Sequence, residues 1–280
     1  MGDTTSKSPD DECVDCKPGT IEIKPKAAIT GQHPTDAAKS QYLHDKLDAF
    51  QRDCDDDGEP GSCHAVGEYY AHVQNDPARA AEVWAENCER RNYGNSCSFL
   101  AKLYRTGAIA GAGATAAERD ARALPLYRRG CKLGTGAACT QAAQLLMQQP
   151  QARADPDAAR AEALAMYRQA CDGNDSPGCF FAGAHYLRTM QKLEKQQEDG
   201  SSAEAAHAAR WALRFLKKGC ALGHPTACHS VAVMYKQGAP GVPKDAQAFE
   251  TFAETTKQLV RHYGATLPEQ QQQKSGAAER

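Results

Sequence analysis

Ten of the twelve cysteines in this 280-residue chain form five pairs that recur along the sequence. Eight residues lie between the partners of the first two pairs, and seven between those of the last three. Successive pairs begin 34, 43, 40 and 49 residues apart, which indicates a repeated unit of about forty residues with insertions. The pairs are Cys54 and Cys63, Cys88 and Cys97, Cys131 and Cys139, Cys171 and Cys179, and Cys220 and Cys228.

Each unit has the pattern of a helix, a short loop and a second helix. The clearest copy is GCALGHPTACHSVAVMYKQG, residues 219–238. Thr226 is predicted to cap its second helix, and Gly238 stands where a left-handed residue would end that helix. The apolar positions are spaced i, i+3, i+4 and i+7, at Cys228, Val231, Ala232 and Tyr235. Repeated helix pairs of this kind predict an all-α fold, an α-solenoid.

A closing helix is predicted to start at Asp245, after the turn GAPGVPKD, and to end at Gly264. Its predicted buried face comprises Phe249, Phe252, Ala253, Thr256, Leu259, Val260 and Tyr263. Alanine is frequent on the helix faces of all the units, and so small a side chain lets neighbouring helices approach closely.

In each unit one cysteine ends the first helix and the other begins the second, so the loop brings the two together. A Cα separation of about 5.5 Å, typical of disulfides, is then expected within each pair. Closing so short a loop stabilises the fold by about 2–3 kcal/mol per bond in the chain-entropy model. The alternative is that each cysteine is a small buried apolar residue, but five recurrences at near-constant spacing favour five disulfides.

The units resemble Sel1-like repeats of the cysteine-bridged kind. The likeness lies in a helix ending in Ala-Cys or Gly-Cys, a loop, and then C-x-x-(L/V/A)-(A/G)-x-x-Y-x-x-G; it is clearest in RQACDGNDSPGCF and KKGCALGHPTACHSVAVMYKQG. It implies five repeats and a closing helix over residues 37–264, between disordered segments at 1–36 and 265–280. Within the family, the resemblance is to mitochondrial assembly factors of cytochrome c oxidase that have five such repeats.

Three segments depart from that pattern: residues 1–36, the insertion GAIAGAGATAAERDARA in the third unit, and KLEKQQEDGSSAEAAHAA in the fourth. A secreted bacterial branch of the family, associated with penicillin binding and β-lactamase activity, is the competing assignment. Those proteins have a signal peptide, and the start of this sequence has no charged-then-apolar segment of that kind.

Composition narrows the classes of partner and compartment. The net charge is -2, and no apolar run approaches the roughly 18 residues of a membrane span, so we expect neither nucleic-acid binding nor a membrane span. Disulfides persist in oxidising compartments, and the sequence has neither an export signal nor an Arg-rich transit peptide. Together with the resemblance, the cysteine pairs predict the mitochondrial intermembrane space, where oxidative import machinery would retain the chain.

The common catalytic motifs are missing from the sequence, which contains no G-x-S-x-G, S-x-x-K, H-E-x-x-H or G-x-x-x-x-G-K. Cys13 and Cys16 form a C-x-x-C, but without the βαβ context of a disulfide reductase or a second ligand pair for zinc. We therefore regard them as a candidate peripheral redox pair and expect no catalytic residue.

Metal and cofactor sites have little support in the sequence. Asp53, Asp55, Asp57 and Gly58 match half of a calcium loop, but position twelve is His64 in place of glutamate, and a solvated acidic hairpin is favoured. Metal ligation by cysteine with His64, His224 or His229 would require that the bridges do not form. Spacing offers no argument for haem ligation by a histidine or Met147, so we expect no cofactor, although the sequence leaves haem and metal open.

The predicted function is a non-catalytic assembly factor of the intermembrane space, acting chiefly on cytochrome c oxidase. A concave surface of the repeats would hold respiratory-complex subunits or other assembly factors. One alternative is a secreted Sel1-repeat protein that binds or hydrolyses β-lactams, and another is a generic protein-interaction scaffold. A disulfide reductase using Cys13 and Cys16 is a weaker enzymatic alternative.

Overall fold

The computed structural model describes residues 36–196 and 203–266. These residues contain twelve α-helices, and their only β-type pairing is an isolated bridge between Ala239 and Val242. The predicted disordered segments at 1–36 and 265–280 lie almost entirely outside the described residues, and Cys13 and Cys16 lie there too.

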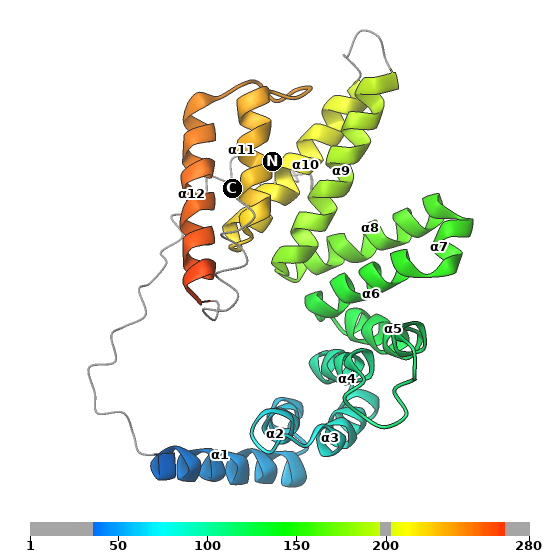
Figure 1. Cartoon of the computed structure of the whole chain (residues 1–280), viewed down its shortest axis with the longest axis vertical. Coiled ribbons are helices and arrows are strands. Elements are labelled where there is room, and N and C mark those ends of the chain that lie inside the picture. Colours follow the sequence, from blue (N-terminus) through cyan, green and yellow to red (C-terminus); the bar gives the residue numbers. More distant parts are fainter. Residues whose placement is uncertain (1–35, 197–202, 267–280) are drawn as a thin grey trace, which may run out of the picture. The chain divides into compact units, whose positions relative to one another are not determined.

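The helices follow the chain order with short connections (Figure 1). They are α1 (Asp36–Asp56), α2 (Pro60–His72), α3 (Pro77–Glu89), α4 (Gly94–Thr106), α5 (Ala116–Lys132), α6 (Gly136–Gln148), α7 (Pro150–Ala154), α8 (Pro156–Asp172), α9 (Ser176–Gln196), α10 (Ala203–Ala221), α11 (Pro225–Gln237) and α12 (Ala246–Thr266).

The described residues form two compact units, one containing α1–α8 and the other α9–α12. Within the first unit each long helix packs against the next in the chain, from α1 on α2 to α6 on α8. In the second unit α9 packs on α10, α10 on α11 and α11 on α12. Packing between sequence neighbours, with few contacts beyond them, is the arrangement expected of helical repeats.

Several helices begin at a proline, which can occupy the first position because that residue needs no intrahelical N–H bond. In α11 this proline is Pro225, and the cap before it is His224, whose Nδ1 accepts a hydrogen bond from Ala227 N at 3.3 Å. The prediction that Thr226 caps this helix is therefore wrong, since the helix starts before that residue. Asp245 does cap α12, because its Oδ1 accepts from Ala248 N at 2.9 Å.

A small residue stands four positions after the second cysteine of every pair, and the next repeat packs against it. These residues are Gly67, Ala101, Ala143, Gly183 and Ala232, all buried. At Gly67 a Cβ atom would lie 2.2 Å from Trp84 Nε1, and at Gly183 one would lie 2.6 Å from Leu216 Cγ. The two glycines thus make room for Trp84 of α3 and Leu216 of α10, which are almost completely buried.

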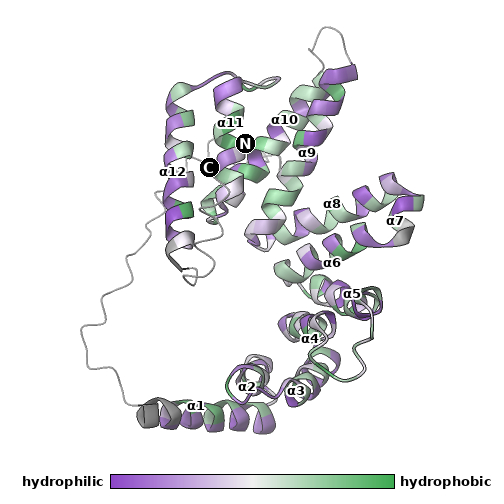
Figure 2. Ribbon diagram, viewed as in Figure 1, coloured by the Kyte–Doolittle hydropathy of each residue, from purple (hydrophilic) through white to green (hydrophobic). Residues whose placement is uncertain are grey.

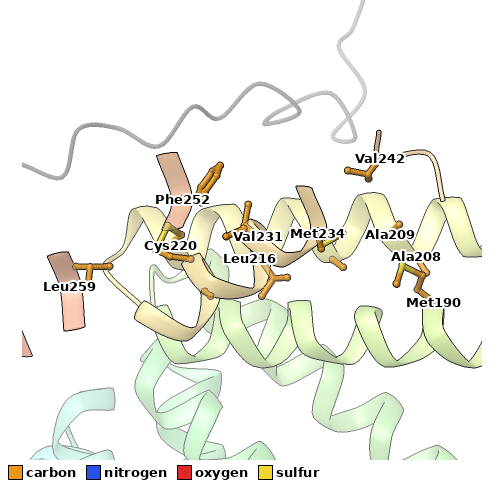
Figure 3. Close-up of a cluster of buried hydrophobic side chains, with 14 residues drawn as sticks. Met190, Ala208, Ala209, Leu216, Cys220, Val231, Met234, Val242, Phe252 and Leu259 are labelled. Atoms are coloured by element: carbon orange, nitrogen blue, oxygen red, sulfur yellow. A yellow bond between two sulfur atoms is a disulfide. The ribbon is translucent and has the colours of Figure 1, made fainter. Parts of the chain in front are cut away.

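The core of the second unit is drawn in Figure 3, where Leu216 and Cys220 of α10 face Val231 and Met234 of α11. From α12 this core receives Phe252 and Leu259.

The predicted buried face of α12 is too wide, because Val260 is 55% exposed and Tyr263 48% exposed. Among the described helices only α11 packs extensively on α12, so a narrow stripe of α12 is covered. Helix α12 also continues through Gly264 to Thr266, contrary to the predicted end.

The two insertions have different structures. The first, residues 107–123, forms the loop after α4 and the first two turns of α5, whose capping box joins Thr115 and Glu118. The second lengthens helices: α9 has 21 residues and α10 has 19, compared with 13 in α2 and α4.

The helices carry hydrophilic and hydrophobic residues side by side, as the mixed colours of Figure 2 indicate. None of the helices in residues 36–196 and 203–266 is long and apolar enough to cross a membrane.

Candidate functional site

Disulfides join the two helices of a hairpin at their adjacent ends. Four of the predicted pairs have this geometry in the structure, with Cα–Cα distances of 4.8 Å for Cys54–Cys63 and Cys88–Cys97, 4.4 Å for Cys131–Cys139, and 4.6 Å for Cys220–Cys228. Each distance lies at the short end of the range that a disulfide can span. Cys171 lies in the last turn of α8, Cys179 lies in the first turn of α9, and both are disulfide-bonded.

The sulfur atoms lie in the protein interior. Cys54 is 8% exposed and Cys131 4%, and the other eight are completely buried. A buried disulfide is shielded from attack by external thiolates, because exchange requires access to one sulfur. The disulfides of the hairpins are therefore structural cross-links.

Every hairpin loop contains one residue with a positive φ angle, and it always precedes the second cysteine by five positions. These residues are Gly58 (φ 64°), Asn92 (54°), Gly134 (89°), Asn174 (59°) and Gly223 (83°). Glycine and asparagine tolerate the left-handed region best, which accounts for their presence. The extra residue in the first two pairs therefore lies between the first cysteine and this turn, and the start of the second helix stays constant.

Substitution of Gly134 tests this turn directly. A Cβ atom at Gly134 would meet nothing within 4 Å, so an alanine there is opposed by backbone strain alone. Gly134→Ala is expected to lower the free energy of unfolding by about 1–2 kcal/mol, measured by urea denaturation. Gly134→Asn places at this position the residue found at Asn92 and Asn174, and it should lower the free energy of unfolding by less than Gly134→Ala does. Equal stability of the alanine variant and the wild type would contradict the strain argument.

A buried polar cluster connects the first two hairpins. His64 of α2, only 8% exposed, has its Nδ1 3.0 Å from Ser96 Oγ of α4. Asn87 Nδ2 of α3 donates to the same hydroxyl at 2.8 Å and to Pro60 O at 2.8 Å. Trp84 Nε1 donates to the carbonyl oxygen of His64 at 3.1 Å. The cluster thus ties three helices of neighbouring repeats together.

The surroundings of His64 favour the neutral imidazole. Burial lowers its pKa below the ordinary value, and the negative charge of Glu68 opposes that shift. The ring lies in contact with Trp84, Tyr93 and Phe99, at centroid distances of 5.8, 5.5 and 4.8 Å. A histidine next to a serine can activate a nucleophile only if substrate reaches the hydroxyl, and Ser96 is completely buried. The His64 and Ser96 side chains therefore contribute to the packing of α2 against α4.

The other side chains considered as ligands, those of His224, His229 and Met147, differ in their surroundings. His224 stacks on Phe180 with the ring centroids 4.7 Å apart and caps α11, and burial lowers its pKa while Asp175 opposes the shift. His229 is exposed, and Met147 is 37% exposed.

The candidate calcium loop does not have the backbone of such a loop. Asp53 and Asp55 belong to helix α1, and Asp57 follows its end. Ser62 Oγ donates to Asp53 at 3.5 Å, which places this aspartate beside the start of α2. Among the described residues, no group of three or more histidine, cysteine, aspartate or glutamate side chains could hold a metal ion.

Comparisons with known proteins agree with the repeat architecture. No protein-family model matches the chain. Cytochrome c oxidase assembly factor 7 of Xenopus tropicalis is 26% identical over 224 residues, which cover 79% of this chain and 88% of that protein. Cytochrome c oxidase assembly factor 7A of Xenopus laevis is 25% identical over 229 residues, covering 81% and 91%.

A solved structure shares the fold. The Sel1 repeat protein from Oxalobacter formigenes superposes with a TM-score of 0.54 at 17% sequence identity, covering 80% of this chain and 85% of that one. At this identity the likeness concerns the fold alone. The chain therefore has the Sel1-like repeat fold, an all-α solenoid of disulfide-linked helix hairpins, and its sequence resembles that of cytochrome c oxidase assembly factor 7 over about four fifths of its length.

Proposed function

We propose that this protein is a non-catalytic assembly factor for cytochrome c oxidase that acts in the mitochondrial intermembrane space. The observation that carries the proposal is the extent of the sequence similarity: the two Xenopus assembly factors match over 88% and 91% of their own length. The similarity thus spans nearly the whole of those proteins, as expected if the shared role belongs to the entire repeat array.

The disulfides support the proposed compartment. Buried structural disulfides need an oxidising environment during folding, and the intermembrane space provides one without secretion. Import machinery that oxidises paired cysteines would both fold the hairpins and retain the chain. In this proposal the repeats over residues 37–264 are the functional part, with the segments at 1–36 and 265–280 as additions.

The proposed mechanism is binding without chemistry. Repeat proteins present extended surfaces formed by successive helices, and each repeat depends on its neighbours for its core. The clients would be respiratory-complex subunits or other assembly factors held on such a surface. The disulfides would keep each hairpin closed, so that the binding residues of its two helices stay in register.

A knockout of the gene tests the proposal. Cells lacking the protein are expected to contain less assembled cytochrome c oxidase, measured on native gels, and the wild-type gene should restore it. A rescue gene carrying serine at Cys88, Cys97, Cys220 and Cys228 should fail, because the opened hairpins expose faces that need their neighbours. Fractionation of the same cells should find that variant depleted from the intermembrane space.

The control for general respiratory damage is the amount of another respiratory complex in the same gels, which is expected to change less than the oxidase. Normal oxidase levels in the knockout would refute the assembly role and leave only the fold. Full rescue by the cysteine variant would refute the role of oxidative folding while leaving the assembly role intact.

A further inference from the structure

The insertion after α4 forms a pocket, defined here as the insertion pocket, with a volume of about 540 Å³. The described residues that line it all lie between positions 107 and 122, inside the insertion GAIAGAGATAAERDARA. Its loop, residues 107–115 between α4 and α5 (Figure 1), is longer than the connection at 73–76 between α2 and α3. Since the shorter connection is enough to join consecutive repeats, the additional residues do more than link two helices.

Two arginines of α5 line the insertion pocket and are bonded to the backbone of its loop. Arg119 Nη1 donates to Ala114 O at 3.3 Å, and Arg122 Nη1 donates to Gly111 O. A Cβ atom at Gly107 would lie 3.3 Å from Arg119 Cδ, so the glycine lets this side chain lie close to the loop. Because the two arginines are three residues apart, they are neighbours on one face of α5. The loop therefore holds two adjacent guanidinium groups in place.

Most of the donor capacity of these two guanidinium groups is unused within the chain. The hydrogen bonds to the loop involve only Nη1 of each arginine. Among the residues that the structure describes, neither Arg119 nor Arg122 forms an ion pair, and the Nη2 groups and Arg119 Nε have no hydrogen-bond partner. A guanidinium presents its N–H bonds as a planar fork that matches the two oxygens of a carboxylate.

The charges that line the insertion pocket favour an anion with a single negative charge. Glu118 also lines it, and its Oε2 accepts hydrogen bonds from Thr115 N at 3.2 Å and Ala114 N at 2.7 Å. These hydrogen bonds and the positive charge of Arg122 lower the pKa of Glu118, so its carboxylate stays ionised at neutral pH. Two arginines and one glutamate leave one net positive charge. One carboxylate neutralises that charge, whereas a phosphate with close to two negative charges would exceed it.

We propose that the insertion pocket binds a carboxylate that carries a small apolar group, either a free short-chain acid or the C-terminus of a peptide. The carboxylate pairs with the unused N–H groups of Arg119 and Arg122, and the apolar group lies on half-buried Ile109. A volume of about 540 Å³ is typical of pockets for small ligands and cannot admit a folded domain. The pocket goes beyond the proposed assembly role and does not depend on it, because it is made of the insertion and not of the pattern that the repeats share.

The test is an NMR titration of the purified full-length protein at low salt, followed through the Nε–H signals of Arg119 and Arg122. The probes are an acetylated tripeptide of glycine, alanine and valine with a free C-terminus, the same peptide as its C-terminal amide, butyrate, and inorganic phosphate. The free peptide and butyrate are expected to shift both signals, the amide to shift neither, and phosphate to bind more weakly than either carboxylate. Affinity should fall as salt is raised. Tighter binding of the peptide identifies a C-terminus as the ligand, and tighter binding of butyrate identifies a free acid.

Substitutions of Arg122 locate the site. Arg122→Gln is expected to weaken carboxylate binding about tenfold, the scale of one hydrogen bond to a charged group. Arg122→Lys should weaken it less, since it keeps the charge but loses the planar fork, and it is the second variant if Arg122→Gln changes the urea unfolding midpoint. The matched control is Lys132→Gln, which removes the same charge from an exposed position of α5. Lys132 lies about 15 Å further along the helix axis, so this variant should bind as the wild type does.

Equal binding of the free peptide and its amide, tighter binding of phosphate than of either carboxylate, or an equal effect of Lys132→Gln and Arg122→Gln would each overturn the carboxylate site. So would the absence of any shift of the arginine signals with millimolar carboxylate at low salt. The titration contains no oxidase and no cells. Its failure would therefore leave the oxidase result standing, and a normal oxidase level in the knockout would leave a positive titration standing.

Discussion

Replacing Cys220 with serine is expected to lower the free energy of unfolding of the α9–α12 unit by about 3–4 kcal/mol. The lost loop closure accounts for ~2–3 kcal/mol, and burying an unpaired hydroxyl for ~1 kcal/mol. The loss is this large because Cys220 and Cys228 are both completely buried and in contact with the core of that unit. Cys220 is the one cysteine of α10, so no other substitution in this helix removes a disulfide.

Urea denaturation followed by fluorescence measures this effect. In a Trp84→Phe background the signal comes from Trp211, which lies on the same helix as Cys220. The double variant Cys220→Ala and Cys228→Ala removes the bond without the buried hydroxyl, and it should recover about 1 kcal/mol of the loss. An unchanged denaturation midpoint for Cys220→Ser under oxidising conditions would mean that this bond does not stabilise the protein.

Replacing Gly67 with alanine is expected to destabilise the α1–α8 unit by about 2 kcal/mol. Alanine favours a helix by about 1 kcal/mol over glycine, but overpacking a core costs about 1–3 kcal/mol and more where the neighbour cannot move. The methyl group would lie 2.2 Å from Nε1 and 2.6 Å from two carbon atoms of the Trp84 ring. Trp84 is 1% exposed, and its Nε1 donates a hydrogen bond to His64 O. The indole ring can therefore make room for the methyl group only by moving out of its position in the core.

The matched control is Gly264→Ala in α12, where a Cβ atom would meet nothing within 4 Å. That variant should be neutral or slightly more stable, since only the helix preference changes. A double-mutant cycle with Trp84→Leu identifies the cause: the cost of Gly67→Ala should shrink when the smaller side chain stands at position 84. If Gly67→Ala proved as stable as the wild type, the close approach of the two helices at this point would be refuted.

The hairpins and their cysteine pairs were predictable because they depend on short-range spacing. The first helix ends one or two residues after the first cysteine, and the second helix begins five or six residues after it, so the short loop brings the two cysteines together. The position of the left-handed residue was also present in the sequence, as a glycine or asparagine five residues before each second cysteine. That signal becomes visible only when the five loops are aligned on the second cysteine.

The cap of α11 was predicted wrongly for a local reason. Both Thr226 and His224 can accept a hydrogen bond from a backbone N–H, and the choice between them depends on where the helix begins. Pro225 lacks an N–H and suits the first helical position, so the helix starts there and His224 becomes the cap.

By itself, the sequence determined the all-α repeat of helix hairpins and the near-constant spacing of the two cysteines across each hairpin loop, because helix periodicity and loop length are local properties of the chain. The tertiary structure alone decided which faces are covered. It leaves Val260 and Tyr263 exposed, since α12 has one main neighbour, and it pairs Gly67 with Trp84 and Tyr186 with Trp211 across different helices. Such contacts depend on how two helices lie against each other, and no spacing within a single helix contains that information.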